Sequence, residues 1–93
     1  MNLPVKYGAL NYEQKRAVRE EYVRVQNNLC AHCKEDLDGP PSVDVANRWI
    51  NKDLFPKDFL KWPIHLHHDH NTGMTIGAVH SRCNGVLWQY FRE

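Results

Sequence analysis

The feature that most constrains the fold is a pair of metal-ligand spacings, C-x2-C and H-x2-C, about fifty residues apart. Cys30 and Cys33 enclose two residues of "CAHC", and His80 and Cys83 repeat that spacing in "HSRC". Two ligands separated by two residues can bind one tetrahedral ion from a tight turn, and four such ligands complete the site. The four side chains therefore predict a zinc site that ties the N-terminal part of the chain to its C-terminal part.

A chain of 93 residues has room for one small core, so we expect a single domain over 1–93 that needs such a link. A structural zinc contributes roughly 10 to 16 kcal/mol of apparent binding free energy near neutral pH. The alternative is a redox C-x2-C pair beside an unrelated Cys83. It is disfavoured because no thioredoxin-like βαβ pattern surrounds the pair.

The number of cysteines and the net charge limit where the protein is expected to act and what it is expected to bind. The three cysteines cannot all pair, and no charged-then-apolar leader precedes Pro4, which predicts a reduced, cytoplasmic location. The sequence contains no apolar run near twenty residues, so no membrane span is predicted. With a net charge of +1, the chain favours nucleic-acid binding only where its positive charge is concentrated locally. That support is the basic stretch that includes Arg16 and Arg19, for which a solvated helix face is the alternative.

Helical patterns occupy both ends of the chain and, less regularly, the middle. Asn11 and Gln14 have capping-box spacing, and Val18, Tyr22, Val25 and Leu29 recur at helical intervals, which predicts an amphipathic helix over 12–27. After the turn residues Gly39 to Pro41, Ser42 is a candidate cap for a helix ending near Leu54. Ser81 is a candidate cap for a last helix that runs nearly to Glu93.

Between the middle and the last helix, the pattern changes to that of a hairpin. Ile64 and Leu66 alternate with His65 and His67, the period of a half-buried strand, and "MTIGAV" over 74–79 predicts the return strand. Gly73 in "HNTG" supplies backbone freedom for the turn. If His80 belongs to the zinc site, the histidines of "HLHHDH" over 65–70 are free for another task.

The stretch "HHDHNTGMTIGAVHSRCN", residues 67–84, resembles the HNH endonucleases, and within them the recombination endonuclease VII-like group. The twelve-residue interval from His68 to His80 matches that family's interval from the catalytic histidine to the third zinc ligand. With "CAHC" included, the match spans 30–84 around an unmatched middle. The resemblance implies an α+β fold: a small zinc-stapled ββα-metal (HNH) domain with its motif over 64–92, an N-terminal amphipathic helix and a C-terminal helix.

The resemblance also implies roles for individual residues. His68 would be the general base, and His67 and Asn84 would bind a catalytic divalent ion, Mg2+ or Mn2+, with Ni2+, Co2+ or Zn2+ as alternatives. The chain departs from the family pattern in having His67 in place of an aspartate, His80 in place of a cysteine, and Ile76 in place of a strand arginine. Hydrolysis of a phosphodiester needs both a base and a cation, so the roles that the resemblance implies agree with the chemistry of that reaction.

A regular strand would point the adjacent residues His67 and His68 to opposite faces, so a bend or bulge near the turn is required. Other residues of the hairpin keep two interpretations. Asp69 either orients a histidine or holds the turn, and His70 either contacts phosphate or packs in the hairpin. Asn71 is expected to tie the loop to its own backbone, and His65 is expected to be an ordinary strand residue. A polar hairpin without catalysis is the alternative for the whole set.

The sequence thus predicts a metal-dependent endonuclease that nicks or cuts DNA and leaves a 5′-phosphate and a 3′-hydroxyl. Arg82, Arg16 and Arg19 are expected on the phosphates, with the last helix along the minor groove. We expect a monomer or weak dimer, of the type common in bacteriophages and active in the host cytoplasm. The alternatives are a catalytically inactive zinc-stapled DNA-binding or adaptor module, and a nuclease that acts on RNA or branched DNA.

Overall fold

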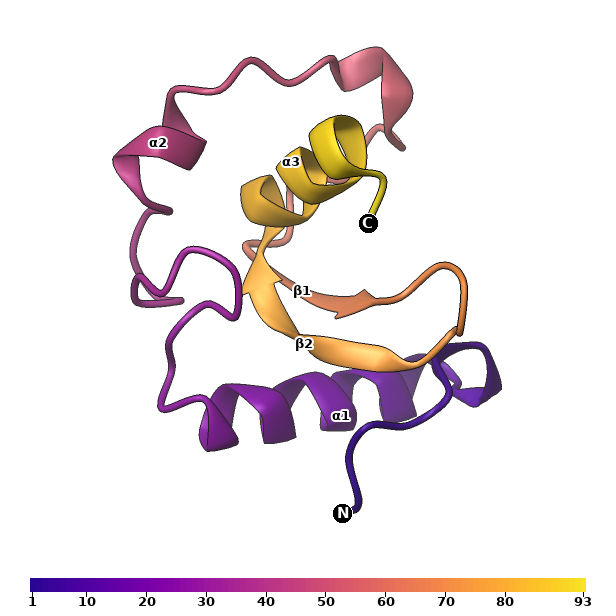
Figure 1. Ribbon diagram of the computed structural model, residues 1–93. Coiled ribbons are helices and arrows are strands. Elements are labelled where there is room, and N and C mark those ends of the chain that lie inside the picture. Colours follow the sequence, from indigo (N-terminus) through magenta and orange to yellow (C-terminus); the bar gives the residue numbers. More distant parts are fainter.

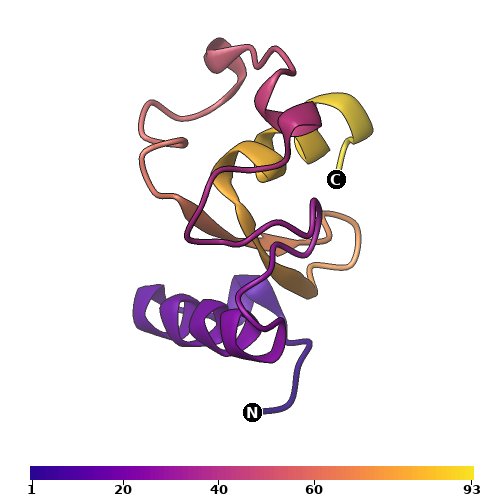
Figure 2. The same cartoon turned by 90° about the vertical axis from the view of Figure 1, so that its left-hand side faces the viewer.

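The chain folds as a long helix, an irregular connection, an antiparallel hairpin and a second helix, and the computed structural model describes residues 1–93. The elements are the 3-10 turns η1 Tyr7–Ala9 and η2 Lys52–Leu54, the helices α1 Tyr12–Val25, α2 Val43–Ala46 and α3 Ser81–Phe91, and the strands β1 Ile64–His68 and β2 Thr75–His80. Figure 1 shows the hairpin between α1 on one side and α3 on the other, and Figure 2 shows the same order from a second direction. The predicted α+β class is confirmed.

Helix α1 begins at its predicted capping box and ends just before the two asparagines that follow it. The Asn11 side chain accepts a hydrogen bond from the Gln14 N–H at 2.8 Å, and the Gln14 side chain accepts one from the Asn11 N–H at 2.9 Å. This capping box satisfies two N–H groups that the first turn leaves without partners. Asn27 and Asn28 both adopt positive φ, so the helix ends at Val25, two residues before the predicted boundary.

The buried face of α1 is shorter than its apolar pattern. Val18 and Tyr22 are buried against the hairpin, and the Tyr22 hydroxyl lies 2.9 Å from the Thr75 hydroxyl. Val25 and Leu29, which the helical spacing placed on the same face, are exposed. The inner half of α1 therefore packs on β2, while the chain beyond it turns away into the cysteine-containing turn.

The predicted helix over 42–54 is wrong. Only the four residues of α2 are α-helical, with Ser42 as their cap, and the chain then continues in irregular form to the 3-10 turn η2. The residues that enter the core are Val45 and Ile50, whereas Trp49 is 68% exposed. Residues five positions apart do not lie on one face of a helix, so a continuous helix could not bury both.

The hairpin carries the irregularity that the histidine pair required. Ile64 pairs with His80 and His67 pairs with Gly77, but the register shifts between His67 and His68. Gly73 has a φ of 77°, a left-handed conformation that glycine adopts without strain. The bulge and the turn were both predicted, and β2 lies one residue later than the predicted 74–79.

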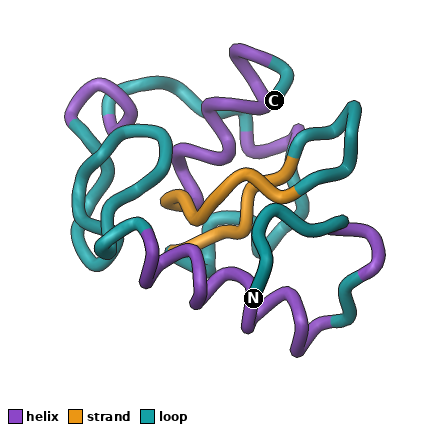
Figure 3. The backbone as a smooth tube through the Cα atoms, turned by 60° about the horizontal axis from the view of Figure 1, so that its bottom comes forward, coloured by secondary structure: helices purple, strands orange, loops and turns teal.

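The N-terminal segment lies alongside the hairpin and brings η1 to its turn (Figure 3). The Tyr7 N–H donates to the Gly73 carbonyl at 2.8 Å, and the Thr75 N–H donates to the Val5 carbonyl at 2.8 Å. A further hydrogen bond joins the Val5 N–H to the Thr75 hydroxyl at 3.0 Å. These bonds fix Tyr7 next to His68, at the end of β1.

Helix α3 follows β2 without a connecting loop. Ser81, the predicted cap, is the first helical residue, and the capping position is His80, whose side chain makes no capping hydrogen bond. Cys83, Val86 and Leu87 are buried as the pattern predicted, while the last turn is exposed. No helix in the structure is both long enough and apolar enough to cross a membrane.

Candidate metal centre and histidine cleft

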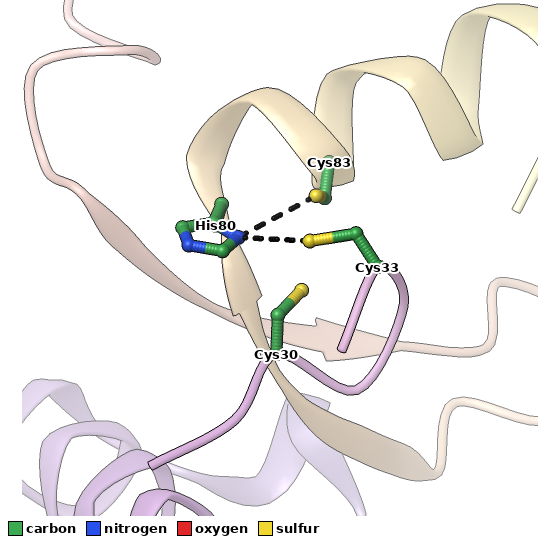
Figure 4. Close-up of side chains that lie close together, drawn as sticks. All are labelled: Cys30, Cys33, His80 and Cys83. Carbon is green, nitrogen blue, oxygen red and sulfur yellow. Dashed lines mark hydrogen bonds between the residues drawn. The ribbon is translucent and has the colours of Figure 1, made fainter. Parts of the chain in front are cut away.

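The four predicted zinc ligands come together where the cysteine turn meets the junction of β2 and α3. The ligand atoms of Cys30, Cys33, His80 and Cys83 all lie within 4.8 Å of one another. Figure 4 shows the three sulfur atoms and the imidazole converging on one point. An ion with Zn–S bonds of about 2.3 Å holds tetrahedral ligands about 3.8 Å apart, so the cluster could bind a metal ion such as zinc.

The His80 imidazole is oriented as a metal ligand would need. Its Nδ1 atom lies 3.4 Å from the Cys33 sulfur and 3.6 Å from the Cys83 sulfur. Its Nε2 atom lies 2.8 Å from the backbone carbonyl of Asp36, to which an Nε2–H donates. A ligating histidine commonly donates its other N–H to such an acceptor, which fixes the tautomer and leaves the first nitrogen free for a metal.

The cysteine turn is held on strand β2 by a side-chain amide. Gln26, just beyond α1, accepts from the Ala78 N–H and donates to the Ala78 carbonyl, both at 2.9 Å. The Ala31 N–H donates to the same carbonyl at 3.0 Å. A side chain at Gly77 would place its Cβ 2.7 Å from the Gln26 amide oxygen. The close approach of turn and strand therefore depends on glycine at that position.

The thiols perturb one another strongly. The hydrogen bond with the Cys83 side chain lowers the pKa of Cys30 to about 4, and burial opposes this shift. The same hydrogen bond and burial raise the pKa of Cys83. Both sulfur atoms belong to side chains with no exposed surface. A divalent cation would relieve this competition by holding all the sulfurs as thiolates.

The second site lies on the other side of the same junction, where Asn84 faces β1. The Asn84 amide nitrogen donates to His65 Nδ1 at 3.1 Å. The same side chain is near enough to His67 to raise its pKa, against the larger lowering caused by burial. His65 and His67 are two residues apart in the strand and therefore lie on the same face, so both point toward α3. Asn84 directly follows Cys83, so the first turn of α3 carries both a member of the Cys3His cluster and this amide.

His68 points to a different neighbour because of the bulge. Its ring stacks on Tyr7, with centroids 3.9 Å apart and planes 9° from parallel. The ammonium group of Lys15 lies 4.3 Å from the centroid of the same tyrosine ring. His70 meets His68 edge to face at 4.8 Å. The predicted base is thus fixed in orientation by an aromatic residue from the N-terminal segment.

Three histidines of this site are biased toward their neutral form. Burial is the main cause that lowers the pKa of His65, His67 and His68 below the ordinary value of 6.5. For His68, the charges of His70, His67 and Lys15 lower the pKa further. A neutral imidazole can accept a proton or bind a metal ion, so the shifts favour both tasks assigned to this stretch.

Asp69 holds the hairpin turn. Its carboxylate accepts from the backbone N–H groups of Asn71 at 2.7 Å and Thr72 at 3.0 Å. These two bonds lower the pKa of the Asp69 carboxyl. The loop-tying task that the sequence assigned to Asn71 therefore belongs to Asp69, and Asn71 contributes its backbone N–H. A catalytic role for Asp69, His70 or Asn71 stays a prediction.

The predicted phosphate-binding arginines separate into two groups. Arg82 donates to the backbone carbonyls of Val45 at 3.3 Å and Arg48 at 2.6 Å, which ties α3 to the end of α2. These bonds hold part of the guanidinium against the fold, and a role for Arg82 on phosphate stays a prediction. Arg16 and Arg19 instead line a cleft of about 990 Å³ that also contains the histidine site.

Two residues of this site were missed by the sequence reasoning. His65 was expected to be an ordinary strand residue, although its two-residue spacing from His67 was a signal that both share a face. Tyr7 carried no signal at all, because its contact with His68 spans about sixty residues of sequence. A scan of family models gave no match to the chain, and neither the curated proteins nor the solved structures supplied a matching relative.

Proposed function

We propose that the chain is a metal-dependent HNH endonuclease that hydrolyses DNA phosphodiester bonds and leaves a 5′-phosphate and a 3′-hydroxyl. The observation that supports this most is the meeting of Asn84, His67 and the bulge-displaced His68 in one cleft. The proposal assigns the Cys3His cluster to a structural zinc. Because Asn84 follows Cys83, the ion that completes the fold would also aim a polar ligand at β1.

In this proposal, His68 removes a proton from the attacking water. Its lowered pKa keeps the imidazole neutral near pH 7, and the Tyr7 stack holds the ring at one angle. His67 and Asn84 would hold a divalent cation, whose charge would offset the charge that builds on the phosphate and the leaving oxygen. One imidazole nitrogen and one amide oxygen leave room for several water or phosphate ligands, which suits Mg2+ or Mn2+ and also accommodates Ni2+, Co2+ or Zn2+.

The test is nicking of supercoiled plasmid by the purified, zinc-loaded protein with each of these divalent metals. We expect nicking by the wild type, its suppression by EDTA, and its recovery when an excess of the supporting divalent metal is added. His68→Ala should lower the rate by about 10²- to 10⁴-fold. The matched control is His32→Ala, since His32 is neither in the metal cluster nor in the cleft lining. Absence of nicking by the wild type with every metal would refute the proposal.

The same experiment decides against the alternative of an inactive zinc-stapled DNA-binding or adaptor module. Such a module would retain plasmid in a gel-shift assay without nicking it, and His68→Ala would change neither property. Products from an active wild type would then be tested for religation by DNA ligase. That reaction requires the proposed 5′-phosphate and 3′-hydroxyl ends.

A further inference from the structure

The cleft that contains the histidine site has two chemically different walls. Its floor is strand β1 with Asn84, one wall is the N-terminal half of α1 with η1, and the opposite wall is the segment 54–62 with Trp88 of α3. The volume of about 990 Å³ is at the upper end of the range for ligand pockets, roughly 300 to 1,000 Å³. The floor carries the proposed chemistry, and apart from Tyr7, which orients His68, the walls are not used by it.

The α1 wall is cationic. Lys15, Arg16 and Arg19 line it, against one carboxylate, that of Glu20, which pairs with Arg16 at 3.1 Å. Lys15 and Arg19 are half-buried and four residues apart, so both lie on the helix face that looks toward the floor. Arg19 is near enough to the floor for its charge to bear on His65. This wall therefore attracts phosphate.

The opposite wall is aromatic. Phe55 and Phe59 stack at 4.6 Å, and Trp88 meets Phe55 edge to face at 5.7 Å. Phe59 continues the row by meeting His65 of the floor at 4.7 Å. Trp62 also lines the cleft and is 59% exposed, with the Lys61 ammonium 5.3 Å from its ring centroid. A row of rings that begins at the floor, together with an exposed indole in the same lining, is suited to the stacking of planar groups.

We propose that the cleft binds an unpaired polynucleotide strand, with its phosphates along α1 and its bases stacked against the aromatic wall. The walls match the two sides of a nucleotide, one anionic and one planar and apolar. Bases in a duplex already stack on each other and cannot use such a platform, whereas unpaired bases gain from it. This inference deepens the proposed function: the scissile phosphate would lie on the floor, and single-stranded stretches would be the substrate class.

The test is binding measured by fluorescence anisotropy without added divalent metal, so that no strand is cut. The probes are a fluorescein-labelled oligothymidylate, the corresponding oligouridylate, and a DNA duplex of the same length. We expect at least one of the single strands to bind about tenfold or more tightly than the duplex. The DNA and RNA arms show which sugar the cleft accepts, and either preference agrees with the proposal.

Matched variants place the binding in the cleft. Trp62→Ala should weaken single-strand binding by about 5- to 100-fold, the range found when one stacking residue is lost. Trp49→Ala removes an equally exposed tryptophan outside the cleft and should leave binding unchanged. Likewise, Arg19→Gln should weaken binding, while Arg24→Gln, on the same helix outside the cleft, should not. Retained zinc and unchanged circular dichroism verify that each variant is folded.

Equal or tighter binding of the duplex would overturn the inference, as would equal effects of Trp62→Ala and Trp49→Ala. These outcomes are distinguishable from failure of the proposed function. A protein that nicks plasmid but shows no single-strand preference would refute the inference alone. A protein that binds single strands through Trp62 but cuts nothing with any metal would refute the nuclease proposal and support the binding cleft.

Discussion

Cys83 and Asn84 are adjacent in sequence, yet they belong to two sites of opposite design. The metal cluster draws four ligand atoms to within 4.8 Å of one another and buries Cys30 and Cys83 completely. The histidine site spreads its side chains along β1 and opens into a large cleft. A closed set of four ligands suits a structural ion, whereas an open set leaves positions for water and substrate. The junction of β2 and α3 thus joins a site suited to folding with one suited to chemistry.

Removal of a ligand from the Cys3His cluster should have the largest effect, because it tests the structural role of that cluster. Cys83→Ser should abolish tight zinc binding and with it the folded state, because a structural zinc supplies roughly 10 to 16 kcal/mol of apparent free energy. Circular dichroism, thermal unfolding and metal analysis would measure the loss. His32→Ala serves as control and should keep one zinc per chain. If Cys83→Ser folded and melted like the wild type, the structural role would be wrong.

The neighbouring substitution should separate the two sites. Asn84→Ala removes an amide from the cleft but leaves all four cluster ligands, so zinc content and thermal stability should stay near those of the wild type. Plasmid nicking should fall by about 10- to 100-fold or more, since a proposed ligand of the catalytic ion is lost and the loss of even an outer-shell partner typically costs that much. Asn47→Ala, at an exposed position after α2, is the matched control. Undiminished nicking by Asn84→Ala would exclude it from the site.

A smaller effect should distinguish orientation from chemistry at His68. Tyr7→Leu removes the ring that stacks on the imidazole at 3.9 Å, and nicking should slow by about 2- to 12-fold, the equivalent of one aromatic pair. Tyr7→Phe keeps the stack and should restore the wild-type rate. Single-turnover rates at saturating plasmid would report this on the cleavage step. Equal rates for the leucine and phenylalanine variants would contradict a positioning role for Tyr7.

The smallest expected effect concerns protonation. Because the pKa values of His65, His67 and His68 are lowered in the folded chain, their imidazoles should titrate below 6.5 when followed by NMR. The unfolded chain, with ordinary histidines, binds more protons between pH 6.5 and those lowered values. Their contribution to folding is therefore complete above about pH 6.5 and is lost as the pH falls. Titration at or above 6.5 would show that burial does not control these groups.

The parts of the fold that sequence could predict are those encoded by neighbouring residues. The capping box of Asn11 and Gln14, the glycine turn at Gly73 and the two ligand spacings each depend on a few consecutive positions. The bulge between His67 and His68 was also predictable, since two adjacent strand residues cannot share a face without one. Local rules thus predicted α1, the hairpin, α3 and the cluster.

What could not be predicted depends on distant partners. The middle helix was wrong because only the packed fold decides that Val45 and Ile50, rather than Trp49, enter the core. The contacts of Arg82 could not be predicted either, because nothing in the sequence shows that two backbone carbonyls around α2 would accept from its guanidinium. Tyr7 reaches His68 only because the N-terminal segment pairs with the far end of the hairpin.

The central claim is that the cluster folds the domain while the histidine cleft cuts, and His68→Ala tests it most directly. Zinc content and plasmid nicking would be measured on the same preparation of this variant and of the wild type. We expect one zinc per chain in both proteins, nicking by the wild type, and a loss of about 10²-fold or more in the variant. Nicking at the wild-type rate by zinc-loaded His68→Ala, or loss of its zinc, would contradict the division of roles.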